Sequence, residues 1–218
     1  MYMKAIIFDM DGVIVDSEPI WKIINFRVYK EFDIPMDDKL YSIIIGKTED
    51  EVFKPFLEKK GHKGKELEDL NQKAIQRRRK LFIETAKDKL ELFPKAKEKI
   101  IELNKKGYKL AIATSSFKQL MDLVVNKFHI RKYFEVLYSG EDVVNGKPNP
   151  EIYLKTMKKL GVKAHETVII EDSIQGLKAA KDSGAYCIAV ETTNPKDKLS
   201  SADKIIKDIS YLPADFDY

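Results

Sequence analysis

Cysteine, histidine and long apolar runs are scarce in this chain of 218 residues. The single cysteine, Cys187, excludes an intramolecular disulfide and any zinc site built from several cysteines, which suits a reducing compartment. The three histidines, His62, His129 and His165, lack the spacing of metal ligands, so we expect surface or structural roles for them. No apolar stretch is long enough to span a bilayer, and the first strand-like run turns acidic at Asp9 before a signal-peptide core could form. We therefore expect a cytoplasmic protein that does not act at a membrane.

An excess of charge of one sign is also missing. Lys and Arg number 39 against 35 Asp and Glu, and the lysines are dispersed along the chain, so nucleic acid is not an expected partner. Glycine-rich nucleotide motifs are absent too, because no G-x-G-x-x-G follows the first predicted strand. Residues 140–147 match the start of a P-loop, but Pro148 stands where a Ser or Thr must reach Mg2+. We expect neither a dinucleotide site nor a nucleoside-triphosphate site.

What the chain does contain is an alternation of short, β-branched apolar runs with amphipathic segments. This alternation predicts an α/β fold whose core is a parallel, Rossmann-like sheet. Several of the predicted helices are followed by a glycine, which is a common helix terminator. The predicted strands cover residues 5–8, 110–113, 136–139, 168–170 and 186–190, and the predicted helices cover residues 96–105, 117–128, 151–160 and 174–183.

A charged segment interrupts this alternation soon after the first strand. Its apolar residues recur at helical spacing and it contains no convincing strand, so we expect an inserted helical domain. An insertion at this point would lie over the carboxyl ends of the strands, where open α/β sheets bind ligands, and would act as a cap. The expected helices cover residues 20–32, 49–60 and 65–85, and the expected domains are 1–16 with 90–218 for the α/β core and 17–89 for the cap.

Polar side chains follow the predicted strands at the points where these end. Asp9 and Asp11 follow the first strand, and two carboxylates so close repel each other unless they share a cation or a proton. Because the carboxyl ends of parallel strands meet at one sheet edge, we expect the later groups to lie near this pair. Carboxylates, a hydroxyl-rich turn and an ammonium group are the parts of a phosphoryl-transfer site that uses Mg2+. The later groups are Thr114, Ser115, Ser116, Lys147, Glu171 and Asp172.

Each of these features has an ordinary structural explanation when it is taken alone. Asp9 and Asp11 could end a strand in a solvated turn, and Thr114 could cap a helix. Lys147 could be a surface lysine, and acidic residues favour a helix N-terminus in any protein. The run 77–80, Arg-Arg-Arg-Lys, is typical of a solvated helix face, although on a cap it could reach a phosphate or a sugar hydroxyl. Only the joint arrangement at the strand ends indicates a function.

Four segments in chain order, FDMDGVIVDSEP, IATSS, GKPNPEIY and IIEDSIQGLKAAKDSGA, resemble the four motifs of the haloacid dehalogenase superfamily. The chain looks like the branch with a helical cap after the first motif, which holds β-phosphoglucomutase and small phospho-sugar phosphatases. The motifs span Phe8 to Ala185, and the cap carries much less recognisable sequence. The resemblance implies a Mg2+-dependent phosphatase of a small phosphorylated metabolite, expected to be a sugar phosphate, that acts through an aspartyl-phosphate. We expect the protein to be a monomer.

The resemblance also implies a role for each matching residue. Asp9 would be the nucleophile, and Asp11 would protonate the leaving oxygen and then activate the attacking water. Thr114, with Ser115 and the adjoining backbone amides, would bind the phosphate. Lys147 would offset charge on the transferring group. The implied metal ligands are Asp9, Asp11 through its backbone carbonyl, Asp172, and Glu171 directly or through water.

The acceptor of the phosphoryl group distinguishes a phosphatase from a mutase. For a β-phosphoglucomutase the resemblance leads us to expect a His shortly after the first motif and an Arg in a cap loop. Trp21 and Glu49 are the nearest counterparts here, and neither can make the same polar contacts. We therefore favour a phosphatase, with a phosphosugar mutase as the alternative. A dehalogenase would have little use for Asp11, and a signalling receiver domain would carry its acidic pair after the first strand instead of at Glu171 and Asp172.

Overall fold

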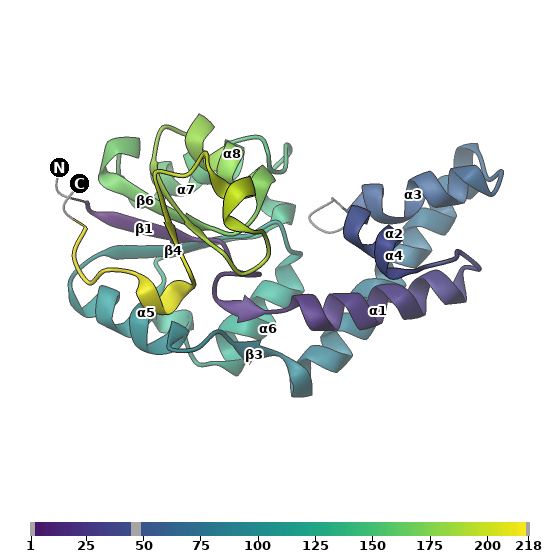
Figure 1. The fold of residues 1–218 in the computed structure, drawn as a ribbon, viewed down its shortest axis with the longest axis horizontal. Coiled ribbons are helices and arrows are strands. Elements are labelled where there is room, and N and C mark those ends of the chain that lie inside the picture. The colour runs from purple at the N-terminus through teal and green to yellow at the C-terminus, as the bar shows by residue number, and fades with distance from the viewer. Residues whose placement is uncertain (1–2, 45–48, 217–218) are drawn as a thin grey trace. The chain divides into compact units, whose positions relative to one another are not determined.

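The computed structural model describes residues 3–44 and 49–216 (Figure 1). The chain divides into two compact units, one made of Met1–Asp16 with Glu91–Tyr218 and the other of Ser17–Leu90. The first unit is an α/β core and the second is helical in its described residues. None of the described helices is both long and apolar enough to cross a membrane.

Six of the described strands form one sheet in which all neighbours are parallel. The central strand is fully buried along its whole length, as expected for a sheet that is covered on both faces. This confirms the predicted α/β class with a parallel, Rossmann-like sheet. In spatial order the strands are β5 (Val136–Tyr138), β4 (Lys109–Ala113), β1 (Ala5–Phe8), β6 (Thr167–Glu171), β7 (Tyr186–Val190) and β8 (Lys204–Ile206).

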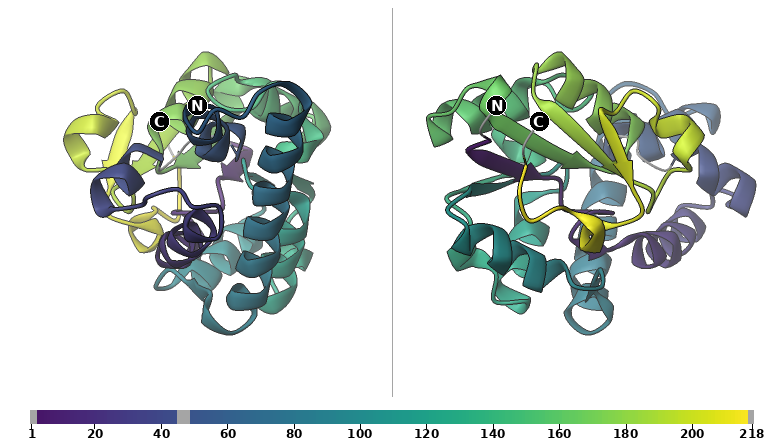
Figure 2. Two further views of the ribbon diagram at one scale, coloured as in Figure 1. Left: turned by 90° about the vertical axis from the view of Figure 1, so that its right-hand side faces the viewer. Right: turned by 60° about the vertical axis from the view of Figure 1, so that its left-hand side comes forward.

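The helices of the core lie on both faces of this sheet (Figure 2). Helices α7 (Glu151–Leu160) and α8 (Ile174–Asp182) cover one face, and α5 (Ala96–Lys105) and α6 (Lys118–Lys127) cover the other. On the face covered by α7 and α8, Ala5 and Ile7 of β1 pack against apolar side chains of these two helices. Short 3-10 turns occur at Arg131–Tyr133, Gly140–Asp142, Ala164–Glu166, Lys196–Leu199 and Ile209–Tyr211.

The register of the central strands fixes where the polar residues emerge. Phe8, the last residue of β1, lies opposite Ile112 of β4 and Ile170 of β6. The next residue, Asp9, donates its backbone N–H to the carbonyl of Ile170 at 2.9 Å, which continues the pairing of β1 and β6 by one step. Asp9 and Glu171 therefore leave neighbouring strands at the same level of the sheet edge.

The second unit consists, in its described residues, of four helices. The long helix packs against the first and the third, and the buried side chains face inward at helical spacing. Pro19 occupies the first turn of the first helix, where its missing N–H has no intrahelical partner to lose. The helices are α1 (Glu18–Glu31), α2 (Asp38–Ile44), α3 (Glu49–Lys59) and α4 (Gly64–Lys89), of which α2 was not predicted.

Two short strands of the core carry the connections to the helical unit. β2 (Val15–Asp16) and β3 (Glu91–Leu92) pair antiparallel, with Val15 opposite Leu92 and Asp16 opposite Glu91. Burial, and then the facing charge of Glu91, raise the pKa of Asp16 above its ordinary value. The chain therefore leaves the core and returns to it at adjacent positions.

Candidate active site

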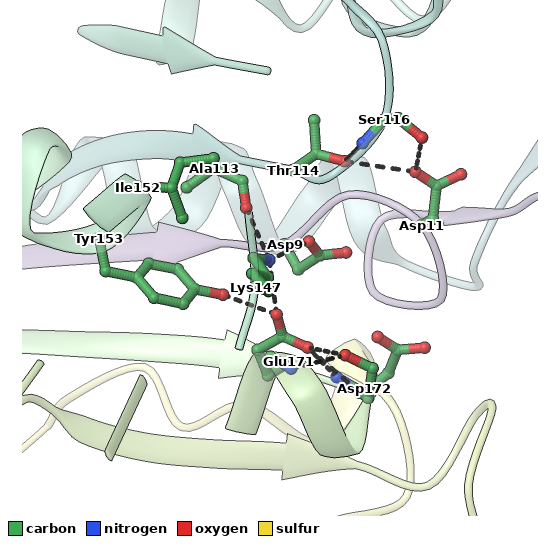
Figure 3. A network of polar contacts seen from close by, with 12 residues as sticks. Asp9, Asp11, Ala113, Thr114, Ser116, Lys147, Ile152, Tyr153, Glu171 and Asp172 are labelled. Atoms are coloured by element: carbon green, nitrogen blue, oxygen red, sulfur yellow. Dashed lines mark hydrogen bonds and ion pairs between the residues drawn. The ribbon is translucent and has the colours of Figure 1, made fainter. Parts of the chain in front are cut away.

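A buried lysine joins the ends of three strands. Lys147, in the loop after β5, donates from Nζ to Oδ1 of Asp9 and to Oε1 of Glu171, both at 2.6 Å (Figure 3). Its third hydrogen bond goes to the carbonyl of Ala113, at the end of β4, at 3.0 Å. The ammonium group therefore uses all of its donors on protein acceptors, which fixes the Asp9 carboxylate relative to the sheet edge.

Burial and charge act against each other on this cluster. Burial raises the pKa of Asp9 to about 7, and the charges of Glu171 and Asp11 add to this effect, although Lys147 opposes it. Burial alone would lower the pKa of Lys147, but Asp9 and Glu171 outweigh it and hold the pKa above its usual value. Burial, followed by the charges of Glu171 and Asp9, raises the pKa of Asp172 well above its ordinary value. One lysine therefore faces a surplus of buried carboxylates.

Glu171 is the most completely bonded member of the cluster. Its Oε1 accepts from the hydroxyl of Tyr153 at 2.6 Å as well as from Lys147. Its Oε2 accepts from the backbone N–H groups of Asp172 at 3.0 Å and Ser173 at 3.1 Å, and from the Ser173 hydroxyl at 3.1 Å. Burial opposes ionisation, but Lys147 and these donors hold the pKa of Glu171 below its usual value. The bonded carboxylate is well suited to orient Lys147.

The absence of a side chain at two glycines makes room for the carboxylates of Glu171 and Asp172. A Cβ atom on Gly176, in the first turn of α8, would lie 1.8 Å from Oε1 of Glu171. A Cβ atom on Gly12 would lie 2.0 Å from Oδ2 of Asp172, and Gly12 has a φ of +76°, a conformation that side chains disfavour. Larger residues at either position would displace an acidic side chain.

The hydroxyl-rich turn after β4 holds Asp11. The Ser116 hydroxyl donates to Oδ2 of Asp11 at 2.7 Å, and the Thr114 hydroxyl lies 3.4 Å from the same oxygen. Thr114 also accepts from the backbone N–H of Ser116 at 3.0 Å, so the turn is internally braced. The side chain of Ser115 is exposed. Hydroxyl groups that follow β4 therefore orient a carboxylate that follows β1.

All seven predicted site residues lie at the carboxyl ends of β1, β4 and β6 or in the loop after β5, and their chemical roles stay predictions. Three bonded residues were not among them. Ser116 was recognised only as part of the hydroxyl turn, and Ser173 could have been found from its spacing to Gly176, because it caps α8 by accepting from that N–H at 3.0 Å. Tyr153 carries no signal in the sequence, since its position on α7 is that of an ordinary core residue.

The predicted magnesium site can be tested against this arrangement. Within residues 3–44 and 49–216, no three His, Cys, Asp or Glu side chains are grouped so as to hold a metal ion by themselves. Asp9 and Asp172 are nonetheless hard oxygen donors beside a surplus of negative charge, as a divalent cation requires. Glu171 is too fully bonded to add a ligand except through water. The residues fit a partial ligand set that water and substrate phosphate would complete.

Comparison with known proteins identifies the family of this site. Residues 6–190 match the family model described as haloacid dehalogenase-like hydrolase. The chain belongs to this family. The resemblance predicted from the four motifs is therefore confirmed.

Several known proteins match this chain over most of their length. The chain is 34% identical to a phosphorylated carbohydrates phosphatase from Thermotoga maritima, covering 84% of this chain and 82% of that one. It is 30% identical to hexitol phosphatase B from Escherichia coli K12, covering 85% and 82%. A solved structure from Thermotoga maritima with the provisional description beta-phosphoglucomutase superposes with a TM-score of 0.74 at 31% identity and 94% coverage of both chains.

Proposed function

We propose that this haloacid dehalogenase-like hydrolase is a Mg2+-dependent phosphatase that removes the phosphoryl group from a phosphorylated sugar or sugar alcohol. One observation carries the proposal. Asp9 is bound by Lys147 through Oδ1, and no hydrogen bond from another described residue reaches its Oδ2. A buried carboxylate held at one oxygen and open at the other is prepared for nucleophilic attack. The phosphatase names of two relatives that are at least 30% identical support the same reaction.

In the first step, Oδ2 of Asp9 forms a bond to phosphorus while the ester bond to the leaving oxygen breaks. Lys147 keeps the attacking carboxylate oriented and offsets part of its charge. Asp11 supplies the proton that the leaving alkoxide needs, and Ser116 holds its Oδ2 at 2.7 Å. Mg2+, held by Asp9, Asp172 and the Asp11 carbonyl, would reduce the repulsion between the carboxylates and the phosphate. The products are an aspartyl-phosphate on Asp9 and the free alcohol.

In the second step, water replaces the alcohol as the reactant. Asp11, now ionised, takes a proton from water, whose oxygen attacks the phosphorus of the aspartyl-phosphate. The bond between phosphorus and Asp9 breaks, and inorganic phosphate is released with Asp9 restored. A sugar hydroxyl in place of water would make the reaction that of a mutase.

The turn after β4 supplies donors for the phosphate oxygens. Among the described hydrogen bonds, the backbone N–H of Ser115 reaches no protein acceptor, so it is available to a ligand. Thr114 is already braced against Ser116 and Asp11, which favours a supporting role for its hydroxyl in addition to the predicted phosphate contact. Backbone amides at such a turn are effective ligands for phosphate.

A phosphate-release screen tests the proposed function. The purified protein is incubated with Mg2+ and a panel of phosphorylated sugars, sugar alcohols, nucleotides and acids, including β-glucose 1-phosphate. We expect release from sugar or hexitol phosphates that is abolished by EDTA and by Asp9→Asn, and retained in Asp122→Asn, an exposed control. Glucose 6-phosphate formed faster than free phosphate would instead establish a mutase. Full activity of D9N would exclude the covalent mechanism.

Two further expectations accompany this proposal. A monomeric state and a cytoplasmic location were predicted from the sequence, and both stay predictions. Size-exclusion chromatography with light scattering tests the first, and fractionation of cells that produce the protein tests the second.

A further inference from the structure

The loop after β7 presents three consecutive polar side chains to neighbouring loops of the core. Thr192, Thr193 and Asn194 follow the end of β7, which lies beside β6 in the sheet. None of the three was predicted as a site residue, and none of them carries a charge. Thr192 and Asn194 bond to the segments that follow β1 and β6, respectively. The loop after β7 therefore connects the two segments that carry the proposed metal ligands.

The first of these contacts restricts the backbone at Gly12. The Thr192 hydroxyl donates to the carbonyl of Gly12. The N–H of Gly12 donates to the carbonyl of Val15 at 2.9 Å. This N–H belongs to the same planar peptide group as the Asp11 carbonyl, so the two hydrogen bonds together restrict the direction in which that carbonyl points. Glycine has more backbone freedom than any other residue, so such restriction matters most at this position.

Asp172 is held in a corresponding way. Nδ2 of Asn194 donates to the carbonyl of Asp172 at 3.0 Å, and the backbone N–H of Asp172 donates to Oε2 of Glu171 at 3.0 Å. The peptide groups on both sides of the Asp172 Cα atom are therefore fixed by side chains. Because Asp172 is also buried, its carboxylate has few alternative positions.

Thr193 lies close to the Asp172 carboxylate and to Gly12. A Cβ atom on Gly12 would lie 2.0 Å from Oδ2 of Asp172 and 2.7 Å from Oγ1 of Thr193, so both oxygens border the small space that the glycine leaves. Burial is the largest cause of the raised pKa of Asp172, and the Thr193 hydroxyl acts against it. Asp172 therefore meets the loop after β7 through its carboxylate as well as through its backbone.

The loop that carries these side chains is itself anchored at both ends. Glu191 donates its backbone N–H to the carbonyls of Ile206 and Lys207, at the end of β8, at 3.1 and 3.2 Å. Beyond Pro195, whose ring limits φ, the 3-10 turn Lys196–Leu199 buries Leu199 in the apolar cluster of the core. The three polar side chains therefore project from a segment whose position the core fixes.

We propose that Thr192 and Asn194 are positioning residues that hold the Asp11 carbonyl and the Asp172 carboxylate in place for Mg2+. This inference rests on the proposed function for the identity of the metal and its ligands. Mg2+ demands near-ideal octahedral geometry, so ligands from two loops bind it well only when the loops are fixed relative to each other. Neutral donors suit this role, because they orient the ligands without adding a charge that would repel the cation or compete with it.

Binding of a divalent cation without substrate tests this role. Mn2+, which prefers the same hard oxygen ligands, is titrated into wild type, Thr192→Val and Asn194→Ala, and the free ion is measured by electron paramagnetic resonance. Each substitution removes one hydrogen bond and no carboxylate. Each is expected to raise the Kd of Mn2+ roughly tenfold or more, the usual effect of losing a group that orients a metal ligand. Thr192→Ser, which keeps the hydroxyl, should stay within about threefold of wild type.

Two matched controls lose the same kinds of hydrogen bond elsewhere in the core. Asn104→Ala removes an amide that donates to the carbonyl of Tyr133 at 3.4 Å. Thr167→Val removes a hydroxyl that donates to the carbonyl of Lys163 at 2.9 Å, at the amino end of β6. Both should leave the Kd of Mn2+ within about twofold of wild type. Asp172→Asn should abolish binding, and binding retained in D172N would place the ion elsewhere and overturn the inference. Circular dichroism establishes that each variant is folded.

Catalysis provides the second readout. With a substrate from the phosphate-release screen, T192V and N194A should need roughly tenfold more Mg2+ for half-maximal rate, and saturating Mg2+ should restore kcat to within about threefold of wild type. Equal losses of Mn2+ affinity in the controls, or a loss of kcat that Mg2+ does not restore, would overturn the role. If the screen finds no phosphatase activity but the affinities differ as expected, the proposed function fails and this role stands. Mg2+-dependent hydrolysis with unchanged Mn2+ affinity in both variants overturns this role alone.

Discussion

At the residue scale, Lys147 connects the stability of the protein to its chemistry. Its ammonium group separates two buried carboxylates, Asp9 and Glu171, and removing it leaves both without a cation. We expect Lys147→Met to lower the free energy of unfolding by about 3–5 kcal/mol, measured by urea denaturation at neutral pH. Lys178→Met, which removes an exposed ion pair with Asp182, should change it by no more than about 0.5 kcal/mol. Similar values for the two variants would contradict this account.

The Asp9 carboxylate should lower the free energy of unfolding at neutral pH although we expect activity to require it. Burial raises its pKa to about 7 from an ordinary value of 3.8, so without metal the ionised form is disfavoured in the folded protein. Ionisation therefore destabilises wild type increasingly as the pH rises from about 4 to about 7, with no further change above. Asp9→Asn, which we expect to be inactive, has no carboxylate to ionise at this position. Its free energy of unfolding should therefore exceed that of wild type by a margin that grows through the same pH window, up to about 4 kcal/mol.

Thermal unfolding in EDTA across this pH range measures the effect of D9N. Saturating Mg2+ should shrink the difference between the two proteins, because a cation at the carboxylates favours their ionised form. A difference that is the same at both ends of the window would show that Asp9 does not titrate there.

At the scale of elements, the first turn of α8 is fitted to Glu171. Replacing a helical glycine by alanine ordinarily stabilises a helix by roughly 0.5–1 kcal/mol. At Gly176 the new Cβ would lie 1.8 Å from Oε1 of Glu171, so we expect the opposite sign, a loss of at least about 1 kcal/mol, together with lower kcat. Gly146→Ala, which meets nothing within 4 Å, serves as the control. A stabilised and active G176A would refute this description of the turn.

The sequence predicted those elements that have a strong periodic signal or a clear end. β1 is buried along its whole length and β7 in four of its five residues, and α7 is capped by Gly161, which is left-handed with a φ of 68°. Elements with little burial were missed. β8 is an edge strand with one buried residue of three, and α2 is only seven residues long. The strands β2 and β3 have only two residues each, which is too short to show an alternation of apolar and polar residues.

The site was predictable where motif spacing determines it. Asp9, Lys147 and Asp172 lie at strand ends or in a connecting loop, positions that chain order alone brings to one edge. The hydrogen bond from Tyr153 to Glu171 was not predictable, because it depends on how α7 is rotated against its neighbours. The adjacent Arg77, Arg78 and Arg79 look equivalent in the sequence, but in the packed helix their side chains donate to Glu31, Asn25 and Glu49, respectively.

At the scale of the whole molecule, the helical unit is inserted at one point of the core. Asp16 and Glu91 are paired across β2 and β3, so their Cα atoms are roughly 5 Å apart. Replacing residues 17–90 by Asn-Gly should therefore close a two-residue hairpin without altering the sheet. We expect the shortened protein to unfold cooperatively, monitored by circular dichroism. The absence of a cooperative transition would show that the core depends on the insertion for folding.

The paired strands β2 and β3 also bear on how such proteins could diversify. Because both connections meet in one hairpin, an inserted segment can grow, shrink or be exchanged by recombination without changing the order or register of the six-stranded sheet. Substitutions in the inserted residues therefore need not disturb the sheet edge at which Asp9, Lys147 and Asp172 lie. The evolutionary histories of the two units can therefore differ.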